Sequence, residues 1–167
     1  MLNSDSLLEQ ARNETGLHEL NGEAVLEALQ RLVVALNSEA QLNDIGQYRA
    51  QASIIQALKN RLRIEGYLSS NPSVTDEVVE RPVFIAGLPR TGTTALHHML
   101  NEDDANRTIR LWEGAELVPP AETATYESDP RIEQSKAGVQ LTEQFLPGFL
   151  KTHLLDAESP DECHMFF

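Results

Sequence analysis

The octapeptide GLPRTGTT, residues 87–94, follows the short apolar run VFIA at residues 83–86. An apolar run of this length that ends at a glycine is typical of a buried parallel strand. Gly87 lets the chain turn sharply off that strand, and Gly92 lets the backbone come close to an anion. The N–H groups of residues 91–94 would converge at the start of a helix, whose dipole favours negative charge. The stretch therefore predicts a strand, an anion-binding loop and a helix in succession.

The side chains of this loop add a cation and hydroxyl donors. Arg90 carries a permanent charge on a forked donor group, and the anion is expected to contact Arg90, Thr91, Gly92, Thr93 and Thr94. A Walker A loop reads G-x-x-x-x-G-K-[ST], and here Thr93 stands where the lysine would reach the β- and γ-phosphates. The replacement argues against a P-loop nucleotide kinase or NTPase, which remains an alternative, as does a tight turn without a ligand.

The stretch RPVFIAGLPRTGTTALHHML, residues 81–100, resembles the segment of the sulfotransferases that binds the 5′-phosphosulfate of 3′-phosphoadenosine 5′-phosphosulfate (PAPS). It resembles the large bacterial sulfotransferase family more than the cytosolic animal enzymes, which favour lysine at the position of Arg90. Residues 11–17, 111–113 and 160–163 also resemble segments of the bacterial family. The resemblance implies transfer of a sulfuryl group from PAPS to a hydroxyl or amine of a small-molecule acceptor, without a metal ion. It also implies that Arg90 stabilises negative charge on the transferring group.

Two residues are candidates for the general base that an acceptor hydroxyl needs near the sulfur. Glu113 follows a predicted strand at 108–112, and open α/β sheets bind ligands at the carboxyl ends of their strands. The related tyrosylprotein sulfotransferases have their base a similar distance downstream of the loop. His153 lies in KTHL, residues 151–154, which resembles the catalytic K-T-H segment of cytosolic sulfotransferases, and histidine suits base catalysis near neutral pH. Both assignments stay open, as do structural roles for either side chain.

The apolar spacing predicts an α/β fold in which a helical N-terminal segment precedes the start of a P-loop-like parallel sheet. The predicted domains are a helical lead-in or cap at 1–70, a linker at 71–81, and the N-terminal part of a sulfotransferase α/β domain at 82–167. Strands are expected at 83–86 and 108–112, and a capping box at 38–41. Helices are expected near residues 7–15, 25–36, 46–69, 93–101 and 130–145, and from 159 onward.

The predicted strands are fewer than a P-loop-like sheet contains. In the bacterial sulfotransferase family, an arginine and a serine further along the chain bind the 3′-phosphate. No segment of this sequence resembles the one that carries them. The sequence therefore predicts the N-terminal part of a longer protein. A non-catalytic fragment that keeps the 5′-phosphosulfate loop is an alternative to an active enzyme.

The composition limits the partners of the chain. Its 167 residues carry a formal net charge of -13, which disfavours docking on nucleic acid or on anionic lipid. The single cysteine, Cys163, excludes an internal disulfide and a cysteine-rich metal site. No secretory signal is recognisable, and no apolar run reaches the roughly 20 residues of a membrane span. We expect a soluble cytoplasmic protein, and the oligomeric state is left open.

Overall fold

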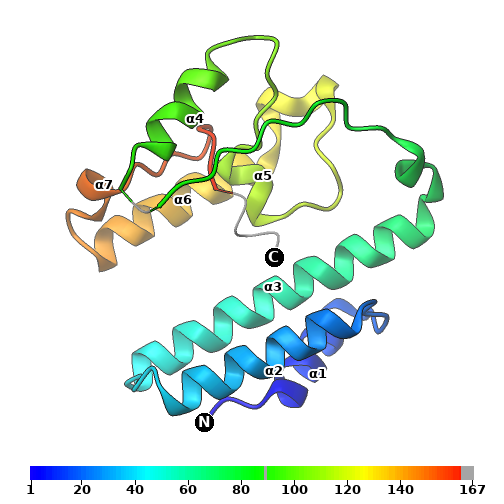
Figure 1. The fold of residues 1–167 in the computed structure, drawn as a ribbon, viewed down its shortest axis with the longest axis vertical. Coiled ribbons are helices and arrows are strands. Elements are labelled where there is room, and N and C mark those ends of the chain that lie inside the picture. The colour runs from blue at the N-terminus through cyan, green and yellow to red at the C-terminus, as the bar shows by residue number, and fades with distance from the viewer. Residues whose placement is uncertain (89, 163–167) are drawn as a thin grey trace. The chain divides into compact units, whose positions relative to one another are not determined.

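The computed structural model describes residues 1–88 and 90–162. They form two compact units, which divide between Asp76 and Glu77. The first unit contains α1 (Ser4–Thr15), α2 (Glu23–Ser38), α3 (Asp44–Ser70) and the 3-10 helix η1 (Pro72–Asp76). The second contains α4 (Thr93–Asn101), α5 (Leu111–Ala115), η2 (Thr123–Ser128), α6 (Pro130–Phe145) and α7 (Phe149–Thr152) (Figure 1). The functional domains predicted from the sequence, with boundaries near residues 70 and 82, stay a prediction.

The first unit is built around an apolar core between helices, in which α1 packs against α3 and α2. Helix α1 begins where the Asn3 side chain accepts the N–H of Ser6 at 2.9 Å, and it ends at Gly16, which has a φ of 68°. The left-handed conformation at Gly16 is the usual helix stop that glycine adopts without strain. The core side chains are Leu7, Leu8, Ala11, Leu29, Val33, Ile54, Ile55, Leu58 and Leu62.

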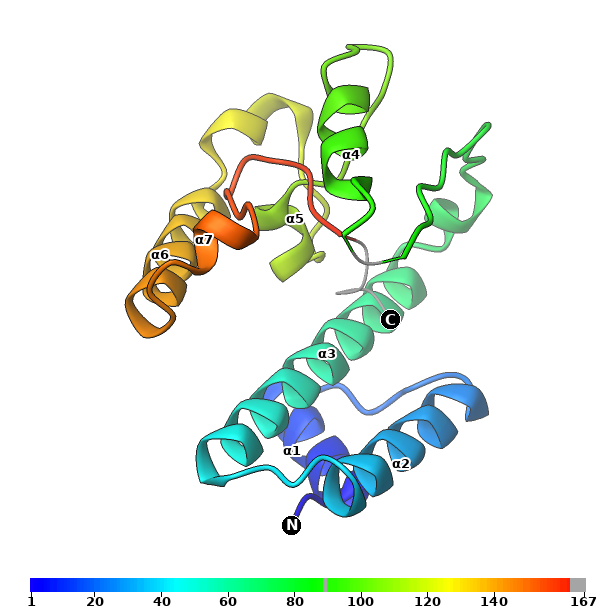
Figure 2. The ribbon, with the colours of Figure 1, turned by 60° about the vertical axis from the view of Figure 1, so that its left-hand side comes forward.

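In the second unit, α5 packs against α6 (Figure 2). Helix α6 begins with Asp129 as its cap, whose carboxylate accepts the N–H of Arg131 at 2.9 Å, and with proline at the first helical position. Both are strong helix-start signals. Trp112 of α5 is fully buried, and Ile132 of α6 is 4% exposed. Trp112 and Ile132 therefore contribute one buried apolar side chain from each of the two helices.

The described C-terminal segment is tied to the start of α5 by backbone hydrogen bonds. The N–H of Leu111 donates to the carbonyl of Ser159 at 3.0 Å, and the N–H of Trp112 donates to Ala157 at 3.1 Å. Arg110 and Pro160 form a single antiparallel bridge. Residues 157–160 therefore have a fixed place beside α5.

The predicted parallel sheet is wrong for the residues that the structure describes. Residues 83–86 form no strand, and Val83 and Phe84 are 74% and 83% exposed. A strand exists only where a neighbour completes its hydrogen-bond ladder, and no segment within 1–88 and 90–162 pairs with this run. The predicted strand at 108–112 is also wrong, because Arg110 makes only the one bridge and α5 begins at Leu111. The described fold is helical rather than the start of an α/β sheet.

Most of the predicted helices are confirmed. Helices α4 and α6 have the bounds predicted from the sequence, and the three N-terminal helices are confirmed with small shifts at their ends. The capping box at 38–41 is wrong, because α2 continues to Ser38 and Asn43 caps α3 instead. The helix expected from 159 is wrong over its described part, where Ser159 and Pro160 bond to the segment that starts α5. Cys163 lies outside the described residues.

Candidate functional site

The loop before α4 folds back tightly on Gly87. The hydroxyl of Thr91 donates to the carbonyl oxygen of Leu88 at 2.6 Å. A Cβ at Gly87 would lie 2.8 Å from Cγ2 of Thr93 and 3.0 Å from the hydroxyl oxygen of Thr91, so no larger residue fits without movement. Gly92, directly before α4, has a φ of 93°, which glycine adopts without steric cost. Both glycines are therefore required by the loop backbone.

The N-terminus of α4 offers donors to an anion. No side chain caps it, so the N–H groups of its first turn lack partners within the helix. A Cβ at Gly92 would meet nothing within 4 Å, so there is open space beside this residue. Arg90 is exposed and has a positive φ of 63°. Unpartnered N–H groups, threonine hydroxyls and one guanidinium are the donors that an anionic group such as phosphate or sulfate requires.

A surface pocket of about 560 Å³ brings the loop together with the residues around α7. It is lined by Arg90, Phe149, Lys151, Thr152 and His153. The imidazole of His153 is half-buried, and its ring centre lies 5.7 Å from that of Phe149. The fold thus gathers two cations and one imidazole, from segments far apart in the sequence, around one space.

Helix α7 is held at the end of α6 by a carboxylate. Glu143 of α6 accepts the N–H groups of Gly148 and Leu150, at 2.8 and 3.3 Å. A negative charge at this position satisfies helix-start donors and complements the helix dipole. The N–H of His153 in turn donates to the carbonyl of Phe149 at 2.9 Å. Glu143 therefore positions the short helix that leads directly into His153.

The carboxylate of Glu113, the other candidate base, accepts hydrogen bonds outside this pocket. Its side chain is buried at 6% exposure and sits in the first turn of α5. One carboxylate oxygen accepts from the guanidinium of Arg107, and the other accepts from the N–H of Arg110 and the hydroxyl of Tyr126, both at 2.9 Å. Burial, together with donation to this carboxylate, raises the pKa of Tyr126. Glu113 does not line the pocket that contains Arg90 and His153.

Sequence reasoning missed the cluster formed by Asp129, Arg131 and Trp112. The guanidinium of Arg131 pairs with the carboxylate of Asp129 at 2.7 Å and lies 5.0 Å from the centre of the Trp112 ring system. The hydrogen bond from Arg131 lowers the pKa of Asp129 to about 2. The Asp-Pro pair before a helical pattern was a readable helix-start signal, whereas the contact with Trp112 depends on tertiary packing.

The comparisons with known proteins place the chain in a family. The sequence model of the Sulfotransferase family matches residues 82–167, and the chain belongs to this family. Two solved structures are similar over nearly its whole length. The sulfotransferase STF9 from Mycobacterium avium is 30% identical, with a TM-score of 0.82 over 99% of this chain. The sulfotransferase STF1 from Mycobacterium tuberculosis is also 30% identical, with a TM-score of 0.84 over 98%.

The chain spans less than half the length of these two sulfotransferases, 43% of the first and 46% of the second. A search of the curated proteins finds no match. Within residues 1–88 and 90–162, no helix is long and apolar enough to cross a membrane. The same residues contain no group of three or more His, Cys, Asp or Glu side chains arranged to hold a metal ion.

The bonding of Glu113 predicts a structural role that can be measured. Glu113→Gln is expected to lower the free energy of unfolding by about 1–3 kcal/mol, because buried donors lose a charged acceptor. Glu127→Gln, which makes the same change at an exposed position, is expected to shift it by less than about 0.5 kcal/mol. Urea unfolding followed by circular dichroism measures both. Equal stability of the two variants would contradict the structural role.

Proposed function

We propose that this protein transfers a sulfuryl group from PAPS to a hydroxyl or amine of a small-molecule acceptor. Membership of the sulfotransferase family supports the reaction class. The observation that carries the proposal is that Arg90 and His153 line one pocket, because the reaction needs an anion-holding group beside a base. We further propose that the reaction needs no metal ion and takes place in the cytoplasm, as the sequence indicates.

The sulfuryl donor PAPS would be held by the loop before α4 and by the N-terminus of α4. When bound, PAPS supplies the sulfuryl group that is transferred. Arg90, the first N–H groups of α4 and the hydroxyls of Thr93 and Thr94 are the donors that would bind its 5′-phosphosulfate. Lys151, in the same pocket, adds a second positive charge. Preorganised cations of this kind stabilise negative charge that develops during group transfer.

We propose His153 as the general base, although the sequence left Glu113 equally open. His153 lies in the pocket with Arg90, and its half-buried ring has solvent access for proton exchange. Glu113 is buried and both its oxygens already accept hydrogen bonds. A base must reach the proton that it removes. The imidazole of His153 would accept the proton of the acceptor hydroxyl or amine.

Donor binding can be tested by calorimetric titration of adenosine 3′,5′-bisphosphate into the 167-residue chain. Arg90→Ala is expected to weaken binding about 10- to 100-fold, since it removes a charge-assisted hydrogen-bond donor. Arg49→Ala, which removes an exposed arginine outside the site, is the matched control and should bind as the unchanged chain does. Tighter binding of ATP with magnesium than of the bisphosphate would favour the nucleotide kinase or NTPase alternative and contradict the proposal.

The role of His153 is tested by the rate of transfer of radiolabelled sulfate from PAPS to a panel of hydroxyl and amine compounds. His153→Asn is expected to slow transfer about 100- to 10,000-fold, the usual contribution of a general base, with the affinity for adenosine 3′,5′-bisphosphate little changed. His18→Asn, at an exposed histidine in the first unit, is the control. Full activity of the His153 variant would eliminate it as the base. A complete absence of transfer by the unchanged chain would favour the non-catalytic alternative.

A further inference from the structure

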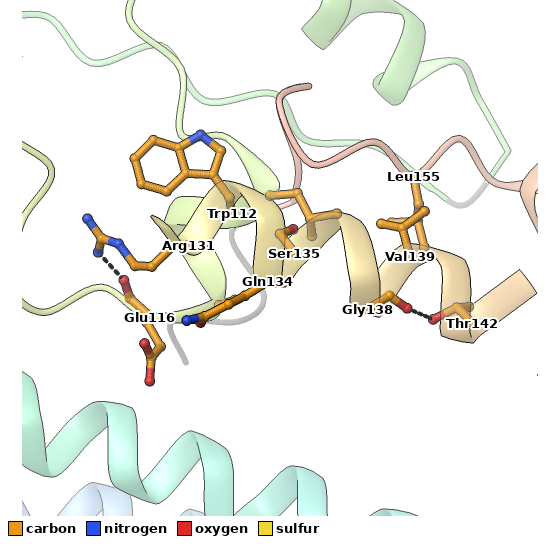
Figure 3. A pocket seen from close by; sticks show the side chains of 11 residues that line it. Trp112, Glu116, Arg131, Gln134, Ser135, Gly138, Val139, Thr142 and Leu155 are labelled. Carbon is orange, nitrogen blue, oxygen red and sulfur yellow. Dashed lines mark hydrogen bonds between the residues drawn. The ribbon is translucent and has the colours of Figure 1, made fainter. Parts of the chain in front are cut away.

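A second pocket, of about 350 Å³, lies along α6 beside α5. Trp112 and Arg131 stand at one end of it, and Val139 and Leu155 stand at the other (Figure 3). Together with Leu111, three of these four side chains make its walls mainly apolar. The volume lies within the range of small-molecule sites. This pocket shares no lining residue with the one that contains Arg90, and PAPS binding and the proposed base do not involve it.

The one cationic side chain that lines this pocket is already neutralised. Two nitrogens of the Arg131 guanidinium donate to the carboxylate of Asp129, at 2.9 and 2.7 Å. A third donates to the backbone carbonyl oxygens of Glu116 and Pro119, at 2.6 and 2.9 Å. Burying an unpaired charge is costly, and Glu116, the other charged side chain of the lining, would repel an anion. A pocket with mainly apolar walls and a compensated cation therefore favours a neutral ligand over an anion. Among the described residues that line it, none offers an unpaired positive charge to an anion.

The chain that follows α7 contributes a residue to each of the two pockets. The backbone at His153 is extended, and residues 154–156 belong to no helix or turn. Side chains two residues apart on an extended chain point to the same side, about 6–7 Å apart. His153 and Leu155 are both half-buried, whereas Leu154 between them is 56% exposed. Leu155 lines this pocket and His153 lines the pocket of Arg90, so one short segment borders both.

We propose that the pocket between α5 and α6 binds the acceptor, and that the acceptor is a neutral, largely apolar alcohol. The inference rests on the proposed function. The apolar part of the alcohol packs against Leu111, Val139 and Leu155, and its hydroxyl points toward His153. In the transfer, the alcohol oxygen forms a bond to sulfur while the bond from sulfur to adenosine 3′,5′-bisphosphate breaks. The hydroxyl proton passes to the imidazole of His153.

Gly138 gives a way to fill the pocket without disturbing the helix that forms its floor. It lies within α6 and lines the pocket, and a Cβ there would meet nothing within 4 Å. Leucine also favours a helix more than glycine does. Gly138→Leu should therefore fold and occupy the space meant for the ligand. Ala137→Leu adds the same side chain at the exposed neighbouring position of α6 and is the matched control.

The test is titration of 1-alkanols into the 167-residue chain, followed by tryptophan fluorescence. Trp112 is the single tryptophan of the chain, so the signal reports on the pocket directly. Affinity is expected to rise about fourfold per methylene from 1-pentanol to 1-octanol, as burial of apolar surface requires. Gly138→Leu should weaken 1-octanol binding at least tenfold, with Ala137→Leu unchanged. Val139→Phe is a second pocket-filling variant that should act in the same way if Gly138→Leu does not fold.

Several outcomes would overturn the inference. They are no saturable fluorescence change, equal affinity for the anion octanoate, or unchanged binding in both filling variants. Adenosine 3′,5′-bisphosphate separates the two proposals. Its binding without that of 1-octanol would overturn this inference alone. Binding of 1-octanol without the bisphosphate would contradict the sulfotransferase function, and with it the acceptor role of the pocket. Transfer of radiolabel from PAPS to 1-octanol, lost in Gly138→Leu, is the expected activity, and binding of both ligands without transfer would overturn the role of the pocket as acceptor site.

Discussion

The buried carboxylate of Glu113 is the interaction on which the second unit depends. It accepts hydrogen bonds from Arg107 and Arg110, which precede α5, and from Tyr126 in η2. The stretch at 107–113 and the η2 segment are thereby joined at one point. The start of α5 also forms backbone hydrogen bonds to Ala157 and Ser159. These two residues belong to the segment that follows His153. Leaving such buried donors without an acceptor would be costly, so the place of α5, and of the segment bonded to it, follows from this one side chain.

The second unit contains charged side chains that are paired within the fold and others that are not. Glu113 pairs with Arg107, and Asp129 pairs with Arg131. In contrast, Arg90 and Lys151, which line one pocket, form no ion pair with any described residue. In a chain with a net charge of -13, an anionic donor must be held by such local groups rather than by a general positive field. The unpaired cations thus mark where an anion can bind, and the compensated Arg131 marks where a neutral molecule can.

Helix-start signals in the sequence made part of the fold predictable. Helix α6 follows its Asp-Pro start, and α4 follows Gly92, so their bounds depend on a few adjacent residues. The strand at 83–86 was predicted wrongly because an apolar run does not contain the partner that a ladder requires. The hydrogen bonds of Glu113 could not be predicted for a related reason. Its significance depends on Arg107, Arg110 and Tyr126, and helical or strand periodicity reports none of these contacts.

The candidate site was only partly predictable for the same physical reason. The residue types of the loop indicated an anion, and a three-residue resemblance singled out His153. No pattern in the sequence indicated that Arg90 and His153 share a pocket, since that proximity depends on how α7 is held at the end of α6 by Glu143. The pocket beside α5 was equally hidden, because its walls come from three separate segments.

The proposed function requires that the loop containing Arg90 and the side chain of His153 belong to one site. The most direct measurement is an NMR titration of the histidine imidazole signals with adenosine 3′,5′-bisphosphate. We expect the signals of His153 to shift with the dissociation constant found by calorimetry and those of the exposed His18 to stay unchanged. The response should disappear in Arg90→Ala. Saturable binding of the bisphosphate that leaves the signals of His153 unmoved would contradict the proposal that the two belong to one site.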